Sequence, residues 1–303
     1  MTAAGAAIYL VALGASPLLL GVVGRIKAMV AGRRGPALVQ PYRDLAKLLR
    51  KGAVYSRTTT LVFRLGPVVA LAATALALLL VPIGGVAPVS FAADLVAFVV
   101  LLALARFALV LAALDTGSSF EGMGASRELF FGALTESALV LVLLVLVRAV
   151  RRASLSALLG PELPAAWSAH GAALVLAALA LFAVLLAENA RIPVDDPATH
   201  LELTMVHEVM VLDHGGPDLA LIEYGSALKL WATSALLASL IVPFRSASDW
   251  ASAAAVVAGI FGIAVAIGVT ESAMARLRLN RVPQLLVGAA VLAAFALVLV
   301  AVG

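Results

Sequence analysis

The sequence predicts an all-α, polytopic membrane protein with about eight transmembrane helices, and three observations support this fold class. Of the 303 residues, 63% are hydrophobic and only 13% are charged, whereas a soluble domain is roughly half apolar and about a quarter charged. The apolar residues form runs of about 20, the length that crosses a bilayer as a helix. These runs are spread evenly, so we expect one integral membrane domain over residues 1–303.

The predicted spans are apolar segments separated by turn-forming residues. The first begins at Ala3 and lacks both a basic leader and a small-residue cleavage site, so we expect it to remain as a helix. Glycine and proline occur together between later segments, at Gly84-Gly85, Gly160-Pro161 and Gly215-Gly216-Pro217. The predicted spans are residues 3–24, 61–83, 91–114, 129–147, 170–187, 225–244, 250–271 and 284–302.

The distribution of Lys and Arg predicts the orientation in the membrane. Loops 25–60, 115–128, 188–224 and 272–283 hold 14 of these residues, whereas the opposite loops hold 4, including Arg148, Arg151 and Arg152. The positive-inside rule therefore places the first four loops in the cytoplasm and both termini on the outer side. The same rule explains the net charge of +4 without a nucleic-acid partner.

The first cytoplasmic loop, residues 25–60, contains a predicted amphipathic helix over residues 41–51. Pro41 occupies the first turn, where proline is tolerated. One side of this helix is apolar and the other is charged, with Leu45, Leu48 and Leu49 opposite Asp44, Lys47 and Arg50. We expect the helix to lie along the membrane surface.

The loop over residues 188–224 is strongly acidic, with eight carboxylates and Arg191 as its only Lys or Arg. Asp196 followed by Pro197 is typical of a helix start and predicts a helix to about Leu212. Glu208 falls in an apolar stripe of that helix, where burial would raise its pKa and suit it to proton relay. The alternative is a structural ion pair of Glu208 with Arg191 or with a basic group of loop 25–60.

Six charged residues fall within the predicted spans, where such residues mark ion or proton paths by default. Arg64, Asp94 and Glu271 lie near span ends, which favours snorkelling or a boundary error. Arg106, Glu136 and Lys229 lie deeper. Glu136 follows Gly132 and Ala133 on a small-residue face that suits contact with another helix, and Lys229 suits either a counter-ion to Glu223 or a proton chain.

Several chemistries are disfavoured by the sequence. The chain has no cysteine, which excludes disulfides and thiolate-held iron–sulfur clusters, so a redox centre belongs to a partner. No phosphate-binding loop or dinucleotide fingerprint is present. His200 and His207 are seven residues apart, which is not a typical metal-ligand spacing, and His214 is interpreted as a loop histidine. The sequence therefore predicts no bound metal and no self-contained enzyme.

Two long motifs resemble one known family. They are Gly32-Arg33-Arg34-Gly35-Pro36 with Gln40-Pro41-Tyr42 and Asp44-Leu45-Ala46-Lys47-Leu48, and Glu188-Asn189-Ala190-Arg191-Ile192-Pro193-Val194-Asp195. Both resemble the subunit-1 or H-type membrane protein of respiratory complex I and its hydrogenase relatives. Complex I proteins typically have Phe-Asp-Leu after the Arg-x-Pro, whereas residues 194–208 here are similar to the formate hydrogenlyase and hydrogenase-4 branch.

The resemblance implies residue roles. The carboxylate chain that links electron transfer to proton or ion movement would consist of Glu136, Glu188, Glu202, Glu208 and Glu223, to which we add Asp195 and Lys229. The residues expected to dock the peripheral redox arm are Arg33, Arg34, Gln40, Asp44, Lys47 and Arg191.

The leading hypothesis is therefore a membrane-anchor subunit of an energy-converting nickel–iron hydrogenase complex in a prokaryotic inner membrane. The resemblance implies hydrogenase large and small subunits, an iron–sulfur protein and antiporter-like subunits as partners, which would hold the nickel–iron centre and the iron–sulfur clusters. The alternative within the family is the quinone-site subunit of a complex I-like NADH:quinone oxidoreductase. A stand-alone transporter and a purely structural anchor are further alternatives, although no internal repeat supports the transporter.

Overall fold

The computed structural model describes residues 3–195, 205–244, 246 and 248–302. This part of the chain is helical and contains no β-strand, so the predicted all-α fold class is confirmed. The long helices are α1 (Ala3–Val30), α3 (Leu61–Leu80), α4 (Asp94–Asp115), α5 (Ser119–Val150), α7 (Leu163–Glu188), α9 (Gly216–Ile241), α10 (Asp249–Ala273) and α11 (Val282–Val302). The short elements are α2 (Gln40–Leu49), α6 (Leu155–Leu158), α8 (His207–Met210) and the 3₁₀ turn η1 (Leu279–Arg281).

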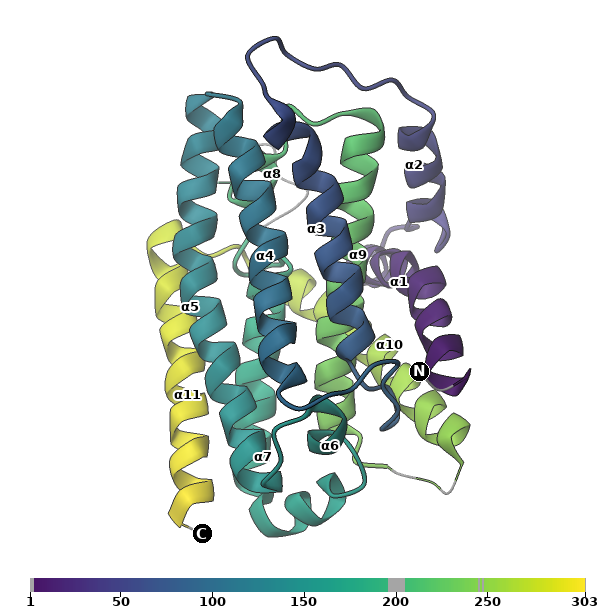
Figure 1. The fold of residues 1–303 in the computed structure, drawn as a ribbon, viewed down its shortest axis with the longest axis vertical. Coiled ribbons are helices and arrows are strands. Elements are labelled where there is room, and N and C mark those ends of the chain that lie inside the picture. Colours follow the sequence, from purple (N-terminus) through teal and green to yellow (C-terminus); the bar gives the residue numbers. More distant parts are fainter. Residues whose placement is uncertain (1–2, 196–204, 245, 247, 303) are drawn as a thin grey trace.

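Seven helices in the described part are long and apolar enough to cross a membrane, namely every long helix except α9. Helix α9 carries Asp218, Glu223 and Lys229 within its first fourteen residues. It nevertheless runs through the middle of the bundle (Figure 1), and nearly all its side chains beyond Lys229 are buried by neighbouring helices. Because α9 faces protein, it tolerates charges that a lipid-facing helix would not.

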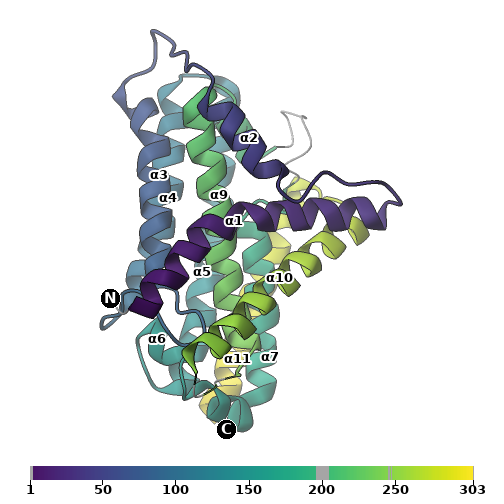
Figure 2. The ribbon, with the colours of Figure 1, turned by 90° about the vertical axis from the view of Figure 1, so that its right-hand side faces the viewer.

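Most of the long helices form an upright bundle, whereas α1 and α10 are inclined to it. Figure 2 shows α1 and α10 crossing the bundle obliquely, with their far ends projecting together on one side. Lys27 of α1 and Glu271 of α10 form an ion pair of 2.8 Å. This pair joins the two inclined helices near that projecting end.

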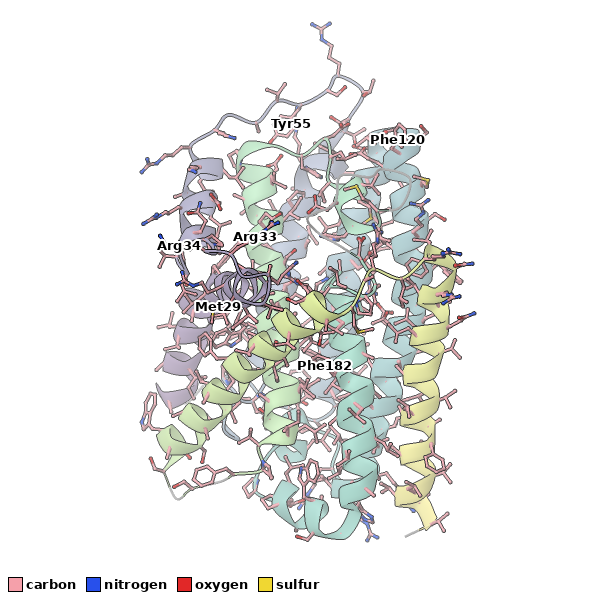
Figure 3. All side chains as sticks on the ribbon, turned by 180° about the vertical axis from the view of Figure 1, so that it is seen from behind. Met29, Arg33, Arg34, Tyr55, Phe120 and Phe182 are labelled. Carbon is pink, nitrogen blue, oxygen red and sulfur yellow. The ribbon has the colours of Figure 1, made fainter. Side chains whose placement is uncertain are left out.

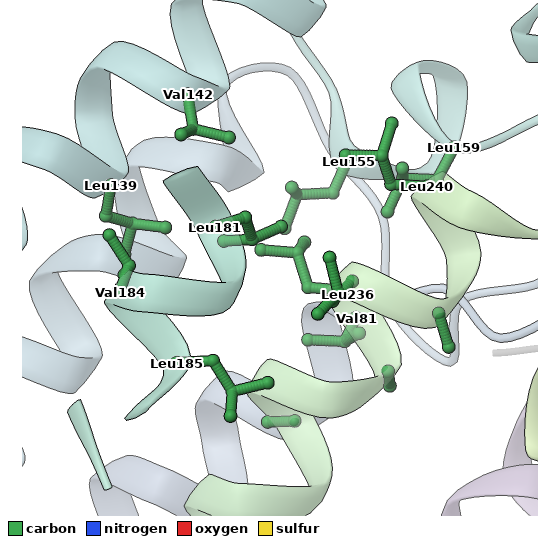
Figure 4. Packing of buried hydrophobic residues seen from close by; sticks show 14 of the residues in the cluster. Val81, Leu139, Val142, Leu155, Leu159, Leu181, Val184, Leu185, Leu236 and Leu240 are labelled. Atoms are coloured by element: carbon green, nitrogen blue, oxygen red, sulfur yellow. The ribbon is translucent and has the colours of Figure 1, made fainter. Parts of the chain in front are cut away.

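The core is built from branched aliphatic side chains of the central helices. Figure 4 shows Leu139 of α5, Leu155 of α6, Leu181 of α7 and Leu236 of α9 packed together. All four are at most 3% exposed. In a membrane such helix contacts depend on close packing rather than on the exclusion of water.

Three helices begin earlier than the apolar runs predicted. Helix α5 begins at Ser119 rather than near residue 129, α7 at Leu163 rather than near 170, and α9 at Gly216 rather than near 225. The added turns contain polar residues that a hydropathy window excludes. Protein contacts keep such residues in the helix, as where the Glu121 carboxylate accepts a hydrogen bond from the Asp213 amide at 3.1 Å.

The helix predicted over residues 196–212 was wrong in its described part. Residues 196–204 lie outside the described residues, and only His207–Met210 forms an α-helical turn. The Asp195 carboxylate accepts hydrogen bonds from the amides of Val206 and His207, both at 3.1 Å. A tertiary contact therefore caps this turn, and sequence spacing alone did not reveal it. By contrast, α2 confirms the helix predicted in loop 25–60, with proline in its first turn and no buried residue.

Candidate functional site

The centre of the candidate site is Arg106, which α4 places inside the bundle with a side chain only 7% exposed. Helix α5 leaves room for it at Gly132, because a Cβ atom there would lie 2.8 Å from the Arg106 Cδ atom. Replacing Gly132 by any larger residue would therefore displace the guanidinium. The small-residue face predicted around Gly132 thus accommodates an arginine.

Three glutamates surround the Arg106 guanidinium. Its Nε atom lies 3.3 Å from an Oε1 atom of Glu128, and its two Nη atoms donate hydrogen bonds to Glu136 and Glu188. Glu128 and Glu136 come from α5, and Glu188 is the last residue of α7. A guanidinium presents its donors in a planar fork, which allows one arginine to bind three carboxylates.

The charges of this Arg106 cluster do not balance when every group is ionised. Lys229 of α9 adds a second cation, with its Nζ atom 3.7 Å from an Oε1 atom of Glu188. Arg106 and Lys229 then face Glu128, Glu136 and Glu188, which leaves one negative charge in excess. An unbalanced charge is costly in a buried site, which makes the cluster a candidate site for a proton or a cation.

His207 adjoins the cluster from the acidic loop. Burial lowers the pKa of its imidazole, and the charge of Lys229 lowers it further. The nearby carboxylates of Glu128, Asp195 and Glu223 raise the pKa, but the net effect is a lower value. The imidazole is therefore predominantly neutral near pH 7. A neutral imidazole has one nitrogen that donates and one that accepts a hydrogen bond, which suits proton exchange.

Two small cavities with charged residues in their walls flank the cluster. One, of about 30 Å³, is lined by Arg106, Glu128, His207, Ser226 and Lys229 among others. The second, of about 10 Å³, lies on the side of Asp195 and Thr135 and again touches Arg106 and Glu128. The first is large enough for about one water molecule and has several polar partners for it. Glu128 therefore lines both cavities.

A second ionic group connects α1, α10 and the loop after α7. The Glu271 side chain is fully buried and lies 2.8 Å from Lys27 Nζ and 3.6 Å from an Arg191 Nη atom. Asp195 forms an ion pair of 2.7 Å with Arg276. The segment that resembles the family motif is thus held by ion pairs at Arg191 and at Asp195.

The predicted proton-path residues fall into three groups. Glu136, Glu188 and Lys229 belong to the Arg106 cluster, and Asp195 lies beside it through His207. Glu223 lies on the wall of a cavity between α1, α2 and α9, and its charge also acts on His207. Glu208 is half-buried in α8, and Glu202 lies outside the described residues. Within the described residues, Lys229 forms its ion pair with Glu188 and not with Glu223, the counter-ion predicted for it.

The predicted docking residues are mostly exposed. Arg33 and Arg34 lie at the exposed end of α1 beside Met29, as Figure 3 shows. On α2, Gln40 donates a hydrogen bond of 2.8 Å to Asp44, and Lys47 lies 3.6 Å from the same carboxylate. Arg191 differs, because its side chain is only 13% exposed and faces Glu271.

The cavity that Glu223 lines has mainly apolar walls. Its volume is about 380 Å³, and Leu20 of α1, Leu45 and Leu48 of α2 and Leu219 of α9 line it. Asp44 and Glu223 supply carboxylates at its walls. The amphipathic face of α2 thus covers a cavity instead of resting only on lipid.

Sequence reasoning missed Glu128 and assigned Arg106 no role. The signal was present, because Glu128, Gly132 and Glu136 are spaced at i, i+4 and i+8 and so share one face of α5. Glu128 lies next to the predicted span boundary at residue 129, where a charged residue is also expected in a loop. A carboxylate on the same helix face as a deep glutamate is the pattern that would have identified it.

Snorkelling, one of the two explanations given for charges near span ends, was wrong for Asp94 and Glu271. Asp94 is fully buried and accepts hydrogen bonds from the Leu155 amide at 2.6 Å and from the Ser154 hydroxyl at 3.0 Å. Glu271 is buried in the ion pairs described above. Both carboxylates therefore have protein partners and do not snorkel. Arg64 fits the prediction, since it is exposed and lies 4.4 Å above the Tyr55 ring.

Comparisons with known proteins show that the sequence and the fold are similar to those of subunits of membrane complexes. A sequence model described as NADH dehydrogenase matches residues 3–302. The chain is 35% identical to hydrogenase-4 component C of Escherichia coli, over 77% of this chain and 73% of that protein. It is 30% identical to formate hydrogenlyase subunit 4 of the same organism, over 91% of each. Its fold is similar to that of a chain in the structure of the membrane-bound sulfane sulfur reductase, an archaeal respiratory membrane complex. The TM-score is 0.81, the sequence identity is 22%, and 98% of each chain is covered.

Proposed function

The chain belongs to the NADH dehydrogenase family, and on that premise we propose that it is the membrane-anchor and proton-conducting subunit of a hydrogenase complex of the formate hydrogenlyase type. Membership makes it a membrane subunit of a complex I-like respiratory or hydrogenase complex. The two Escherichia coli relatives are components of hydrogenase-4 and of formate hydrogenlyase, which supports the hydrogenase branch.

The observation that carries the conducting role is the charge imbalance of the Arg106 cluster. Three glutamates share two cations inside the bundle, so a small change in the surrounding charge moves a proton on or off a carboxylate. Redox events in a docked partner would supply that change.

The docking role is assigned to the exposed basic residues at the α1–α2 end. Arg33 and Arg34 at the end of α1, together with Lys47 on α2, present positive charge beside an amphipathic helix. A peripheral redox arm with a complementary acidic surface would bind there, which orients association more than it adds affinity. This end would then face the cytoplasm of a prokaryotic cell whose inner membrane holds the protein.

The redox centres of the proposed complex would belong to its partners. This chain has no cysteine to ligate an iron–sulfur cluster, and within the described residues no group of three potential ligands could hold a metal. The nickel–iron centre and iron–sulfur clusters would therefore reside in hydrogenase subunits, and antiporter-like subunits would complete the membrane part.

The test replaces carboxylates of the cluster in the intact complex. Glu128→Gln and Glu136→Gln keep side-chain shape but cannot exchange a proton. We expect retained assembly and hydrogen evolution but a loss of about tenfold or more in the proton movement that accompanies turnover. Glu162→Gln is the matched control, because Glu162 is exposed and pairs only with Arg152 in the described part. Unchanged proton movement in both cluster variants would leave a structural anchor as the function.

The cavity between α1, α2 and α9 favours a second candidate function, quinone binding. Its volume of about 380 Å³ lies in the range of small-molecule pockets, and its walls are mainly apolar. Leu48→Trp would fill this space. If the purified complex reduces quinone and this variant loses that activity while assembly persists, the chain is a quinone-site subunit. If hydrogen evolution proceeds normally in the variant and no quinone is reduced, this candidate is excluded.

A further inference from the structure

A groove with apolar and basic walls lies at the end of the bundle where α5 ends. It has a volume of about 490 Å³ and runs between the C-terminal ends of α5 and α11. Leu144 and Val147 of α5 and Leu297 of α11 form its apolar wall, and Arg148, Arg151 and Arg152 form its basic wall. It is therefore apolar on one side and strongly cationic on the other.

Two of the three arginines have no protein partner for their guanidinium groups in the described part of the chain. Arg148 and Arg151 are both exposed and make no side-chain hydrogen bond or ion pair there, whereas Arg152 lies 3.0 Å from Glu162. Arg151 has a φ of 59°, which ends α5 and turns the chain at the groove. Two unneutralised guanidinium groups thus lie one turn apart at the end of a transmembrane helix.

The groove lies at the depth expected for lipid headgroups. Trp250 in the first turn of α10 and Phe244 before it are more than half exposed, and Trp167 in the first turns of α7 donates a hydrogen bond to the Leu240 carbonyl. Helices α7 and α10 begin at the end of the bundle where α5 ends. Exposed aromatic residues concentrate at membrane interfaces. Toward the bilayer centre, α11 exposes Val291 and Phe295, which face lipid chains.

Topology does not explain the arginines. The positive-inside rule accounts for the basic residues at the other end of the molecule, and Arg148, Arg151 and Arg152 run against it. A favourable interaction with the carbonyl end of α5 involves Arg148, in the last turn, but not a cluster of three. A local anionic ligand would explain their number and position.

We propose that this groove binds the phosphate headgroup of an anionic phospholipid. Guanidinium groups bind phosphate through paired, charge-assisted hydrogen bonds, and basic pockets between transmembrane helices select anionic lipids. The acyl chains would lie along Leu144 and Leu297, which continue the groove toward the lipid-facing side of α11. The lipid would fill the space between the ends of α5 and α11.

The test measures lipid retention by the full chain in detergent, using native mass spectrometry with added dioleoylphosphatidylglycerol. We expect one retained lipid per chain and about tenfold weaker binding in the double variant Arg148→Gln, Arg151→Gln. Dioleoylphosphatidylcholine should not be retained, and inorganic phosphate should not displace the bound lipid. The double variant Arg148→Lys, Arg151→Lys keeps the charges and should recover part of the binding.

The matched control is the double variant Arg278→Gln, Arg281→Gln, which removes the same charge from exposed arginines at the opposite end of α11. It should keep the retained lipid. Equal loss in both double variants, or equal retention of phosphatidylcholine by the native chain, would show a nonspecific charge effect and overturn the proposal.

A second measurement identifies the occupant in the assembled membrane complex. The chain has no cysteine, so Ala153→Cys at the groove wall carries a photoreactive maleimide at a single position. Crosslinking to phospholipid supports the lipid site. Crosslinking predominantly to another protein subunit overturns it and makes the groove a subunit interface.

Discussion

Arg106 is the main counter-ion inside the bundle, because in the described structure only its guanidinium contacts all of Glu128, Glu136 and Glu188. A lysine at this position would offer a single ammonium on a flexible stem and could not span three carboxylates. The arrangement also shows why Gly132 is glycine. Any side chain there would occupy the space that the guanidinium needs.

The first prediction concerns Arg106→Leu. The substitution leaves three buried or half-buried carboxylates without their main cation, and breaking a buried ion pair from one side costs about 3–5 kcal/mol. We expect a large fall in the thermal unfolding temperature of the purified chain in detergent, with Arg106→Lys in between. A fall no larger than that of an exposed substitution such as Arg57→Leu would contradict the role given to Arg106.

The second prediction concerns His214, whose ring stacks on Phe63 with centroids 4.0 Å apart and whose two nitrogens have no hydrogen-bond partner in the described part. Burial lowers the pKa of this imidazole, against a weaker opposite effect of Asp218 and Asp213. The folded chain therefore stays neutral at His214 while the unfolded chain takes up a proton near pH 6.5. Stability should fall as the pH drops below about 6.5 and stop falling below the folded pKa.

His214→Phe keeps the stacking surface and removes the titration. We expect this variant to lose less thermal stability than the native chain between pH 7.5 and 5.5, with little change at pH 7.5. The measurement is the unfolding temperature across that pH range. Parallel curves for the two proteins would show that His214 does not titrate in the way its burial implies.

Sequence alone identified part of the site. Glu136 and Lys229 are charges inside apolar runs, and such placement is visible without a structure. Glu128 and Glu271 lie near the ends of apolar runs, where a buried carboxylate and an exposed one have the same local sequence. Only the long-range partners, Arg106 and Lys27, distinguish the two cases.

Among the elements, α1 shows how one close contact positions a neighbouring segment. A Cβ atom at Gly21 would lie 2.1 Å from the Leu38 carbonyl oxygen, whereas a Cβ atom at Gly14 on the same helix meets nothing within 4 Å. The segment that leads into α2 therefore packs directly on the backbone of α1. The position of α2, and of the cavity that it covers, depends on that approach.

The third prediction uses these two glycines as a matched pair. Gly21→Ala must displace the backbone at Leu38, and we expect a cost of about 1–3 kcal/mol together with faster hydrogen exchange in α2. Gly14→Ala should be neutral or stabilise α1 by up to about 1 kcal/mol. Similar stability and α2 exchange in both variants would show that α2 is not held by this contact.

The elements were predicted with unequal success for one physical reason. Each long helix was recognised because a run of apolar residues is required to cross a bilayer. The turn at α8 depends instead on Asp195 capping amides eleven and twelve residues later, so local spacing indicated a longer helix there. Helices whose length and composition are required by the bilayer can therefore be predicted from the sequence. A turn that depends on a tertiary contact, such as α8, cannot.

At the scale of the whole molecule, charged contacts extend from the inclined helices to the bundle centre. Lys27 and Arg191 meet at Glu271, the segment after Arg191 leads to Asp195, and Asp195 caps the turn that places His207 beside Glu128. A displacement of α1 by a docked partner could therefore reach the Arg106 cluster through the short segment over residues 191–195. This continuity gives the proposed docking and conducting roles a shared physical route.

The last prediction concerns orientation, on which the docking role depends. Because the chain has no cysteine, single cysteines at Val54, which is 88% exposed beyond α2, and at the exposed Pro161 before α7 report the two ends separately. In intact spheroplasts of a prokaryotic host, a membrane-impermeant maleimide should label Pro161→Cys and spare Val54→Cys. Opening the membrane should expose both. The reverse pattern would put Arg33, Arg34 and α2 outside, where a cytoplasmic redox arm could not reach them, and the docking proposal would fail even if the Arg106 cluster conducts protons.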